Sequence, residues 1–226
     1  MNMKDITIIF LTENRLPEKW AAYQRKVLLE AIGAVPLISF SRKPMDLGIN
    51  ILQTEPRSLA NIYRQMLKGA KMADTPFIAV AEDDTLYPAE HFQVRPDMDA
   101  FAYNQTHWSL YTWDEPVYHW RDRKGNYSLI APRELVIQAM EERNAKWPNG
   151  IPEKIVGELG RPMVERNMKV TLRNSVEFAT TVGVVNFQHN LGMDPYARVH
   201  KKRYGPVKAY DIPHWGKAAD LVKRFE

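Results

Sequence analysis

Short apolar runs alternate with helix-like stretches through the first hundred residues of the sequence. The runs are residues 6–11, 35–40, 49–52 and 77–81. Residues 6–11 are mostly β-branched and apolar on both faces, which is typical of a buried parallel strand. Apolar residues recur at helical spacing after Pro17 and again after Ser58. Serine is a common N-cap residue of helices. We therefore expect an α/β fold, a three-layer α/β/α sandwich with a mostly parallel central sheet.

The second half of the sequence is less regular. We expect strands at residues 101–113, 128–131 and 178–187. We expect helices at residues 132–146, 152–165 and 216–225. No internal repeat and no Gly/Ser-rich linker interrupts the chain, so we expect a single domain over residues 1–226.

Cysteine is absent from the 226 residues, which excludes a disulfide scaffold, a cysteine-ligated metal centre and a cysteine nucleophile. A metal in this protein must therefore be held by oxygen or imidazole ligands. The content of 45% hydrophobic and 26% charged residues excludes a disordered chain. No stretch reaches the roughly 18 apolar residues of a membrane span, and the N-terminus has no signal-peptide pattern. We expect a soluble, cytoplasmic protein.

The positive charge of the chain is concentrated at its C-terminus. Lys and Arg number 31 against 27 Asp and Glu, a net charge of +4, and residues 194–226 carry this whole excess. A basic segment of this kind often faces the phosphate groups of a nucleotide, a nucleic acid or an anionic lipid. A solvated helix and loop that keep the protein soluble are an equally open interpretation.

Three consecutive carboxylates, Glu82, Asp83 and Asp84, directly follow the apolar run 77–81. Ligands of open α/β sheets bind beyond the carboxyl ends of the strands. Adjacent carboxylates repel one another unless a cation compensates them, and Mg²⁺ and Mn²⁺ prefer oxygen ligands. The pattern therefore indicates a divalent-metal site, with a solvated acidic turn as the alternative.

A second polar turn, with Thr12, Asn14 and Arg15, follows the first apolar run. In a parallel sheet this turn lies at the same edge as the acidic triplet. Thr and Asn side chains can hydrogen-bond a base or a ribose, and Arg can pair with a phosphate. Neither GxGxxG nor GxxxxGK[ST] occurs in the sequence, which argues against a dinucleotide site and a P-loop.

Together these features resemble the nucleotide-sugar-binding half of the GT-A fold glycosyltransferases, most closely the family-2-type enzymes. The likeness rests on the order of five elements over about residues 6–90. A strand is followed by a T-x-N-R turn, a helix, a second helix that begins with S-L-A-N, and an apolar strand that ends in E-D-D. The resemblance implies that the nucleotide-diphosphate sugar is bound by about residues 1–95. It also implies that the acceptor half, with the basic C-terminal segment, is formed by about residues 96–226. The Q-x-x-R-W motif of processive family-2 synthases is absent, which points to a small single-transfer enzyme.

The resemblance implies a role for each matching residue. Asp84 would hold a divalent metal, Mn²⁺ or Mg²⁺, on the sugar-nucleotide diphosphate, as in a variant D-x-D motif. Glu82 and Asp83 would flank the ribose and the sugar. The other matching residues would line or support the nucleotide pocket: Thr12, Asn14, Arg15, Ser58 and Asn61.

An inverting transfer needs a general base for the acceptor hydroxyl, and in GT-A enzymes this base is usually a carboxylate from the second half. The candidates are Asp114, Glu115, Glu153, Glu158 and Glu165. We favour Glu158, an isolated acid between glycines at the start of a predicted helix. An exposed helix carboxylate without a catalytic role is the alternative.

Histidine can complete a metal shell, and His189 is the best placed of six because it follows the apolar residues 182–187. The segment from His189 to Gly192 resembles one found late in such enzymes. A hydrogen-bonded histidine at a strand end is the alternative, and His200 and His214 are further candidates. Lys201 and Arg203 could close over the diphosphate as a basic lid.

Aromatic residues gather in the acceptor half, where sugars or bases could stack on them or where they could form a half-buried strand. They are Trp108, Tyr111, Trp113, Tyr118 and Trp120.

The sequence thus predicts a metal-dependent glycosyltransferase that moves a sugar from a nucleotide-diphosphate sugar to an acceptor hydroxyl. The acceptor stays open among a modified nucleic-acid base, a glycan and a lipid-linked sugar. A Mg²⁺-dependent nucleotidyltransferase would also use acids at strand ends, although its usual glycine-rich phosphate loop is absent. A non-enzymatic nucleic-acid-binding protein would use the basic C-terminal segment but leaves the acidic triplet unexplained.

Overall fold

A seven-stranded sheet organises the computed structural model, which describes residues 3–120, 122–192 and 204–226. The strand order is β10-β6-β9-β4-β1-β2-β3. The strands are β1 Ile6–Leu11, β2 Leu37–Ser41, β3 Ile49–Leu52, β4 Phe77–Glu82, β6 Ala100–Asn104, β9 Leu129–Pro132 and β10 Asn174–Phe178. All their pairings are parallel except those of β9, which runs antiparallel to β4 and β6. The predicted α/β class with a mostly parallel central sheet is therefore confirmed.

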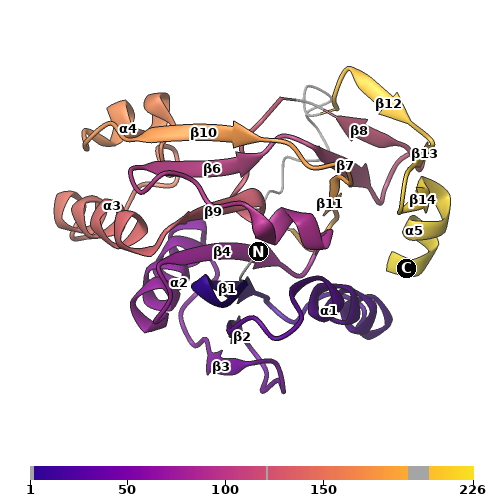
Figure 1. The fold of residues 1–226 in the computed structure, drawn as a ribbon, viewed down its shortest axis with the longest axis horizontal. Helices are drawn as coiled ribbons and strands as arrows, with labels where there is room; N and C mark the ends of the chain where they lie inside the picture. The colour runs from indigo at the N-terminus through magenta and orange to yellow at the C-terminus, as the bar shows by residue number, and fades with distance from the viewer. Residues whose placement is uncertain (1–2, 121, 193–203) are drawn as a thin grey trace.

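Helices cover both faces of this sheet (Figure 1). α2 Leu59–Met72 and α3 Arg133–Lys146 pack together over one face, and α1 Glu18–Ile32 with the short 3₁₀ helix η2 Ala89–Gln93 covers the other. Successive side chains of a strand point to opposite faces, so Ile9 contacts the α2 side while Ile8 contacts the α1 side. Both side chains are fully buried. This explains why the central strands β1 and β4 are largely apolar on both faces.

The helix boundaries follow local signals. Ser58 caps α2, as expected, because its hydroxyl accepts a hydrogen bond from the backbone N–H of Asn61 at 3.1 Å. Gly33 ends α1 with a φ of 59°, a conformation that glycine adopts without strain. Pro132 directly precedes α3.

A second sheet of five strands, which the sequence analysis did not predict, packs beside the first (Figure 1). Its order is β12-β8-β7-β11-β5. The strands are β5 Thr85–Leu86, β7 His107–Tyr111, β8 Tyr118–Trp120, β11 Val184–Gln188 and β12 Val207–Ala209. The C-terminal helix α5 Ala218–Phe225 follows the short pair β13 Asp211–Ile212 and β14 Gly216–Lys217. Trp20 of α1, Phe187 of β11 and Phe225 of α5 form the aromatic centre of this region.

Three predicted elements differ from the structure. The predicted strand 101–113 is two strands in different sheets, β6 and β7, and the predicted strand 178–187 divides in the same way between β10 and β11. The predicted helix 152–165 is wrong, because only α4 Pro162–Met168 is helical there.

The buried side chain of Arg143 explains the missing part of that helix. Its guanidinium donates hydrogen bonds to the backbone carbonyls of Gly157 at 2.8 Å and Glu158 at 3.3 Å. Gly160 then takes a φ of 69°, outside the helical region. These backbone groups are therefore satisfied in an irregular segment.

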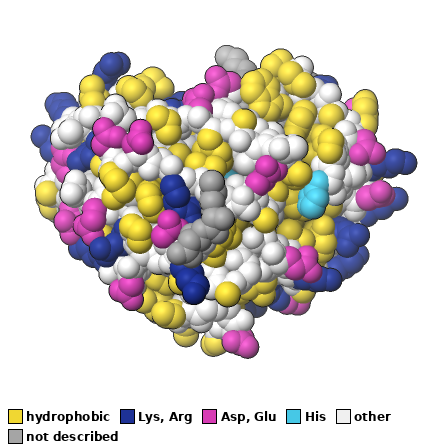
Figure 2. Space-filling model, in the orientation of Figure 1, with side chains coloured by type: hydrophobic (Ala, Val, Ile, Leu, Met, Phe, Trp, Pro, Cys, Tyr) yellow, Lys and Arg dark blue, Asp and Glu magenta, His cyan; other side chains and the backbone are white. Residues whose placement is uncertain are grey.

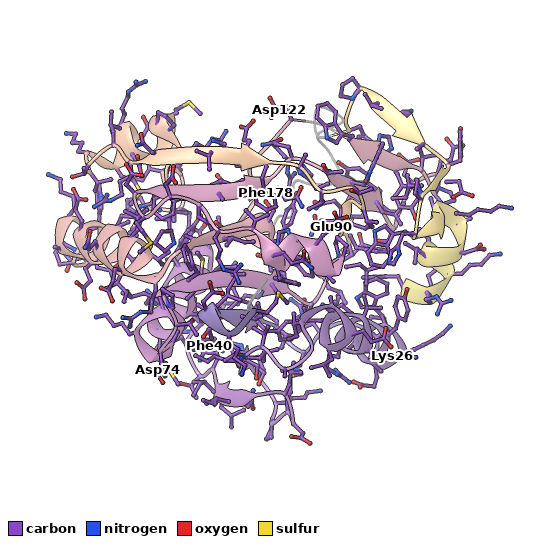
Figure 3. All side chains as sticks on the ribbon, in the orientation of Figure 1. Lys26, Phe40, Asp74, Glu90, Asp122 and Phe178 are labelled. Atoms are coloured by element: carbon purple, nitrogen blue, oxygen red, sulfur yellow. The ribbon has the colours of Figure 1, made fainter. Side chains whose placement is uncertain are left out.

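The surface shows the pattern expected for a folded globular domain. Acidic and basic side chains are interspersed on the face seen in Figure 2. Figure 3 places Lys26 and Asp74 at the periphery and Phe40 within the core. Within the described parts of the chain, none of the helices combines the length and apolar character needed to cross a bilayer.

Candidate functional site

The acidic turn lies at the carboxyl ends of two neighbouring parallel strands. β1 and β4 pair in register, with Leu11 opposite Glu82. The residues that follow therefore meet: the Thr12 hydroxyl donates a hydrogen bond to the Asp83 carboxylate, and the Asp83 N–H donates to the carbonyl of Leu11 at 3.3 Å. The structure thus brings together the two polar turns that the sequence analysis placed at one edge of the sheet.

Buried side chains fix the backbone of this turn. The indole Nε1 of Trp20 donates to the carbonyl of Asp83 at 2.9 Å. The amide of Gln24 donates to the carbonyls of Glu82 and Thr85 at 3.2 and 3.0 Å. The sequence analysis assigned neither Trp20 nor Gln24 to the site, although a glutamine on the apolar stripe of a helix was an available signal.

Replacing Gln24 with leucine tests this support. Leucine keeps the bulk of the side chain but leaves two carbonyl groups without their donor, and an unsatisfied buried polar group costs about 1–3 kcal/mol. We expect the free energy of unfolding, measured by urea denaturation, to fall by about that amount. The matched control Gln138→Leu, on the exposed side of α3, should change it little. Equal effects of the two substitutions would contradict the role assigned to Gln24.

Asp84 lies beside His189, the other residue predicted to bind a metal. The antiparallel pairing of β5 and β11 places them together, and Nε2 of His189 lies 3.4 Å from Oδ2 of Asp84. The other oxygen of Asp84 accepts hydrogen bonds from Thr85 at 2.9 Å and from Asn186 at 3.1 Å. Asn186 was not predicted to belong to the site.

The donor set fits a divalent cation that is shared with a ligand. The described residues contain no group of three or more His, Asp or Glu side chains arranged to hold a metal on their own. Mg²⁺ usually takes one or two carboxylates from the protein and fills its remaining positions with water and phosphate oxygens. Asp84, with His189 beside it, can provide such a partial shell.

Mutual repulsion among the carboxylates points in the same direction. Burial, and then the charge of Asp84, raises the pKa of Asp83 from 3.8 to about 7. The pKa of Glu82 is also raised well above its ordinary value, mainly by burial and then by Asp84 and Asp83. A cation bound at this turn would relieve the repulsion.

An open cleft in front of the turn gathers most of the predicted residues. Seven of them line it: Thr12, Arg15, Ser58, Glu82, Asp83, Asp84 and His189. Leu191 and Gly192, from the segment that the sequence analysis singled out with His189, also line the cleft, and so do Glu13, Arg57 and Gln65, which were missed. The cleft therefore combines carboxylates with two arginine side chains.

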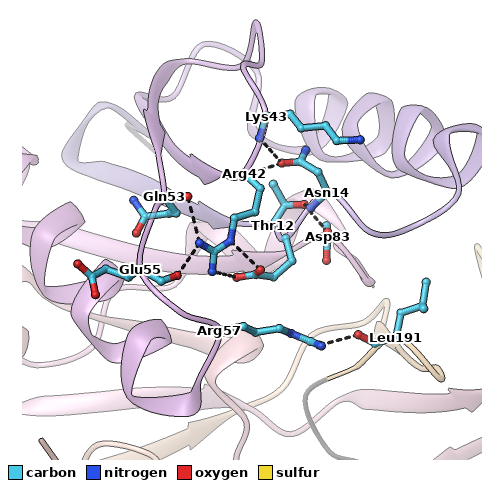
Figure 4. Close-up of polar contacts among 10 residues, drawn as sticks. Thr12, Asn14, Arg42, Lys43, Gln53, Glu55, Arg57, Asp83 and Leu191 are labelled. Atoms are coloured by element: carbon cyan, nitrogen blue, oxygen red, sulfur yellow. Dashed lines mark hydrogen bonds and ion pairs between the residues drawn. The ribbon is translucent and has the colours of Figure 1, made fainter.

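Arg57 is the most informative of the missed residues. Its Nη2 donates a hydrogen bond to the carbonyl of Leu191 at 2.5 Å, which links the loop before α2 to the segment after β11 (Figure 4). Its Nε is buried and has no hydrogen-bond partner among the described residues. Burial and then the nearby Arg15 lower the pKa of Arg57. Two guanidinium groups that repel each other in this way are suited to an anion.

Asn14 and Asn61 were predicted to line or support the pocket, and neither lines the cleft. Asn14, at a φ of 49°, accepts hydrogen bonds from the backbone N–H groups of Arg42 and Lys43 at 2.7 and 2.9 Å and so holds the loop after β2 (Figure 4). Asn61 is buried within the first turn of α2. The part of each residue in ligand binding stays a prediction.

Glu158 lies in the irregular segment before α4 and not at the start of a helix, which corrects its predicted setting. Its carboxylate pairs with Arg161 at 3.0 Å and does not line the cleft. Its charge nevertheless contributes to the raised pKa values of Glu82 and Tyr63. Its role as the base stays a prediction. Lys201, Arg203 and the alternative His200 lie outside the described residues.

The chain matches no protein-family model and no curated protein sequence. It is similar to a nucleotidyl transferase from Methanothermobacter thermautotroptrophicus (12% identity, 76% of this chain and 86% of that chain, TM-score 0.43). It is also similar to a glycosyltransferase involved in glycosylation of the major capsid of PBCV-1 (10% identity, 80% of this chain and 91% of that chain, TM-score 0.46). A third similar structure is HddC from Yersinia pseudotuberculosis (12% identity, 80% of this chain and 92% of that chain, TM-score 0.47). With TM-scores below 0.5, these similarities are no basis for assigning an activity.

Proposed function

We propose that this protein is a metal-dependent glycosyltransferase that moves a sugar from a nucleotide-diphosphate sugar to an acceptor hydroxyl. The observation that best supports the proposal is a single cleft lined by the Asp84–His189 pair and by Arg15 and Arg57. A diphosphate carries the charge that both a divalent cation and guanidinium groups neutralise. The resemblance of the T-x-N-R and E-D-D segments to family-2-type enzymes supports a sugar nucleotide as its source.

Each side chain then has a defined task. Arg15 and Arg57 would bind the diphosphate, while Asp84 and His189 would hold Mn²⁺ or Mg²⁺, which would stabilise the negative charge of the leaving group. Thr12, through its hydrogen bond to Asp83, keeps the acidic turn in place beneath the donor. The acceptor oxygen attacks the anomeric carbon, the bond to the diphosphate breaks, and a carboxylate such as Glu158 accepts the hydroxyl proton.

Donor binding is the first test of this function. We expect sugar esters of uridine, guanosine or thymidine diphosphate to raise the melting temperature, and only when Mn²⁺ is present. A ligand at a hundred times its Kd stabilises a folded protein by about 2.7 kcal/mol. Arg57→Ala should abolish the shift, whereas Arg64→Ala, at an exposed position of α2, should preserve it.

The reaction products separate the two transferase classes. Transfer or hydrolysis that breaks the bond between the sugar and the diphosphate supports the proposal. Pyrophosphate release from a nucleoside triphosphate and a sugar 1-phosphate would assign a nucleotidyltransferase instead. If none of these donors changes the melting temperature, with or without Mn²⁺, the proposed function is wrong.

A further inference from the structure

A cavity of about 280 Å³ lies between β12, its neighbour β8 and the loop that connects β7 to β8. It is lined by Asp114, Glu115, His119, Tyr204 and Lys208. None of these residues lines the cleft at the acidic turn. The cavity lies in the part of the chain whose aromatic residues the proposed donor site does not use.

Aromatic rings form a fixed wall beside this cavity. The ring of Tyr204 stacks on that of Tyr111, with centroids 4.2 Å apart and planes at 24°, and His119 meets Tyr204 edge-on at 4.9 Å. The hydroxyl of Tyr204 donates a hydrogen bond to Asp114 at 2.7 Å and accepts one from Trp113 at 3.3 Å. Tyr204 is therefore held in one orientation from both sides.

His119 provides an unpartnered polar atom in the cavity lining. Its side chain is only 4% exposed, and its Nδ1 has no hydrogen-bond partner among the described residues. Buried polar atoms are usually hydrogen-bonded, so an exception in a cavity wall suggests a ligand that supplies the partner. Burial lowers the pKa of His119, so the imidazole is neutral near pH 7 and can bond a hydroxyl group.

The cavity and the His189 side of the donor cleft lie at the same edge of the five-stranded sheet. β7 and β11 are parallel, with Tyr111 opposite Gln188, and the N–H of Thr112 donates to the carbonyl of Gln188 at 3.0 Å. Adjacent parallel strands are about 4.8 Å apart. The loop that leads from β7 to Asp114 therefore begins one strand spacing from the end of β11, which His189 directly follows. A molecule in the cavity can therefore extend toward the donor cleft.

We propose that this cavity is a binding subsite for an uncharged carbohydrate acceptor. The proposal rests on the proposed glycosyltransferase function and names the acceptor class that the function left open. Sugars stack their C–H faces on aromatic rings and present hydroxyl pairs to carboxylates. Asp114 and Glu115 provide carboxylate oxygens in the described lining, and these can accept hydrogen bonds from sugar hydroxyl groups.

Binding to an array of neutral and anionic glycans, measured with the full chain, tests the subsite. We expect the wild-type protein to retain a set of neutral glycans. His119→Ala and Tyr204→Ala should bind that set roughly tenfold more weakly, the effect of one lost hydrogen bond or stacking contact. His214→Ala, at an exposed position outside the cavity, is the matched control.

Conservative variants protect the test against misfolding. Tyr204→Phe keeps the stacked ring and loses only the hydroxyl's hydrogen bonds with Asp114 and Trp113, so it should fold and bind with an intermediate loss. Retention of no neutral glycan, or equal binding by wild type and His119→Ala, would overturn the proposal. Binding of single-stranded DNA that depends on His119 and Tyr204 would also overturn it, in favour of a nucleic-acid acceptor.

Failure of the subsite and failure of the proposed function give different results. If sugar nucleotides with Mn²⁺ still raise the melting temperature while no glycan depends on His119, only the carbohydrate subsite is wrong. If glycans bind through His119 while no sugar nucleotide binds, the glycosyltransferase function is wrong and the cavity is a carbohydrate-binding site of another kind.

Discussion

Asp84→Asn should lower the metal-dependent turnover of the sugar-nucleotide donor by about 100- to 1,000-fold, the effect of removing one group that stabilises a developing charge. The change removes the carboxylate charge next to His189 that we propose to bind the metal. Asparagine has the same size, and its carbonyl oxygen can still accept the hydrogen bonds from Thr85 and Asn186. The fold should therefore persist while activity is lost. Steady-state hydrolysis of the donor over a Mn²⁺ titration measures the effect.

The control for this substitution is Asp74→Asn, an exposed carboxylate just beyond the end of α2 (Figure 3). It changes the net charge in the same way and should leave turnover unchanged. Circular dichroism and the melting temperature in EDTA show whether Asp84→Asn is folded. Turnover and Mn²⁺ dependence equal to those of the wild type in a folded Asp84→Asn protein would rule out Asp84 as a metal ligand.

The part of the site that could be predicted is the part that strand order determines. Residues 6–11 and 77–81 are apolar on both faces, which marks them as central parallel strands, and the carboxyl ends of such strands share one edge. Thr12 and Asp83 therefore had to lie close together once both strands were recognised. Predicting that Asp84 lies beside His189 required one more observation, namely that a strand ends just before the histidine.

The rest depended on contacts that leave no local pattern. Arg57 reaches the cleft because a loop residue before α2 meets Leu191, 134 positions later in the chain. The segment around Glu158 is irregular because a buried arginine from another helix binds its carbonyl groups. The strands of the second sheet have only two to five residues each, too few for a clear period-two signal.

Asp83→Asn should stabilise the metal-free protein at pH 8, which is an unusual direction for a substitution in a buried site. Burial and Asp84 raise the pKa of Asp83 to about 7, above its ordinary value of 3.8. Between these two pH values the native state retains a proton that the unfolded chain has released. The stability associated with this proton is complete below about pH 4 and is lost as the pH rises to about 7.

A pKa difference of about three units corresponds to roughly 4 kcal/mol, and partial exposure of the turn to water reduces this to about 2–4 kcal/mol. Asparagine has no charge to lose, and it can still accept the hydrogen bond from the Thr12 hydroxyl. The difference in unfolding free energy between variant and wild type, measured in EDTA by urea denaturation, should therefore be small at pH 4 and about 2–4 kcal/mol in favour of the variant at pH 8.

Mn²⁺ should reverse this advantage, because a cation favours the ionised carboxylates of the wild-type turn. We expect the wild type to gain stability with Mn²⁺ at pH 8 and the variant to gain less. A difference between the two proteins that does not vary between pH 4 and pH 8 would contradict the raised pKa of Asp83. If Mn²⁺ stabilises the wild type and the variant equally, the cation does not act by relieving repulsion within the acidic turn. In that case the proposed metal site consists of Asp84 and His189 without a contribution from Asp83.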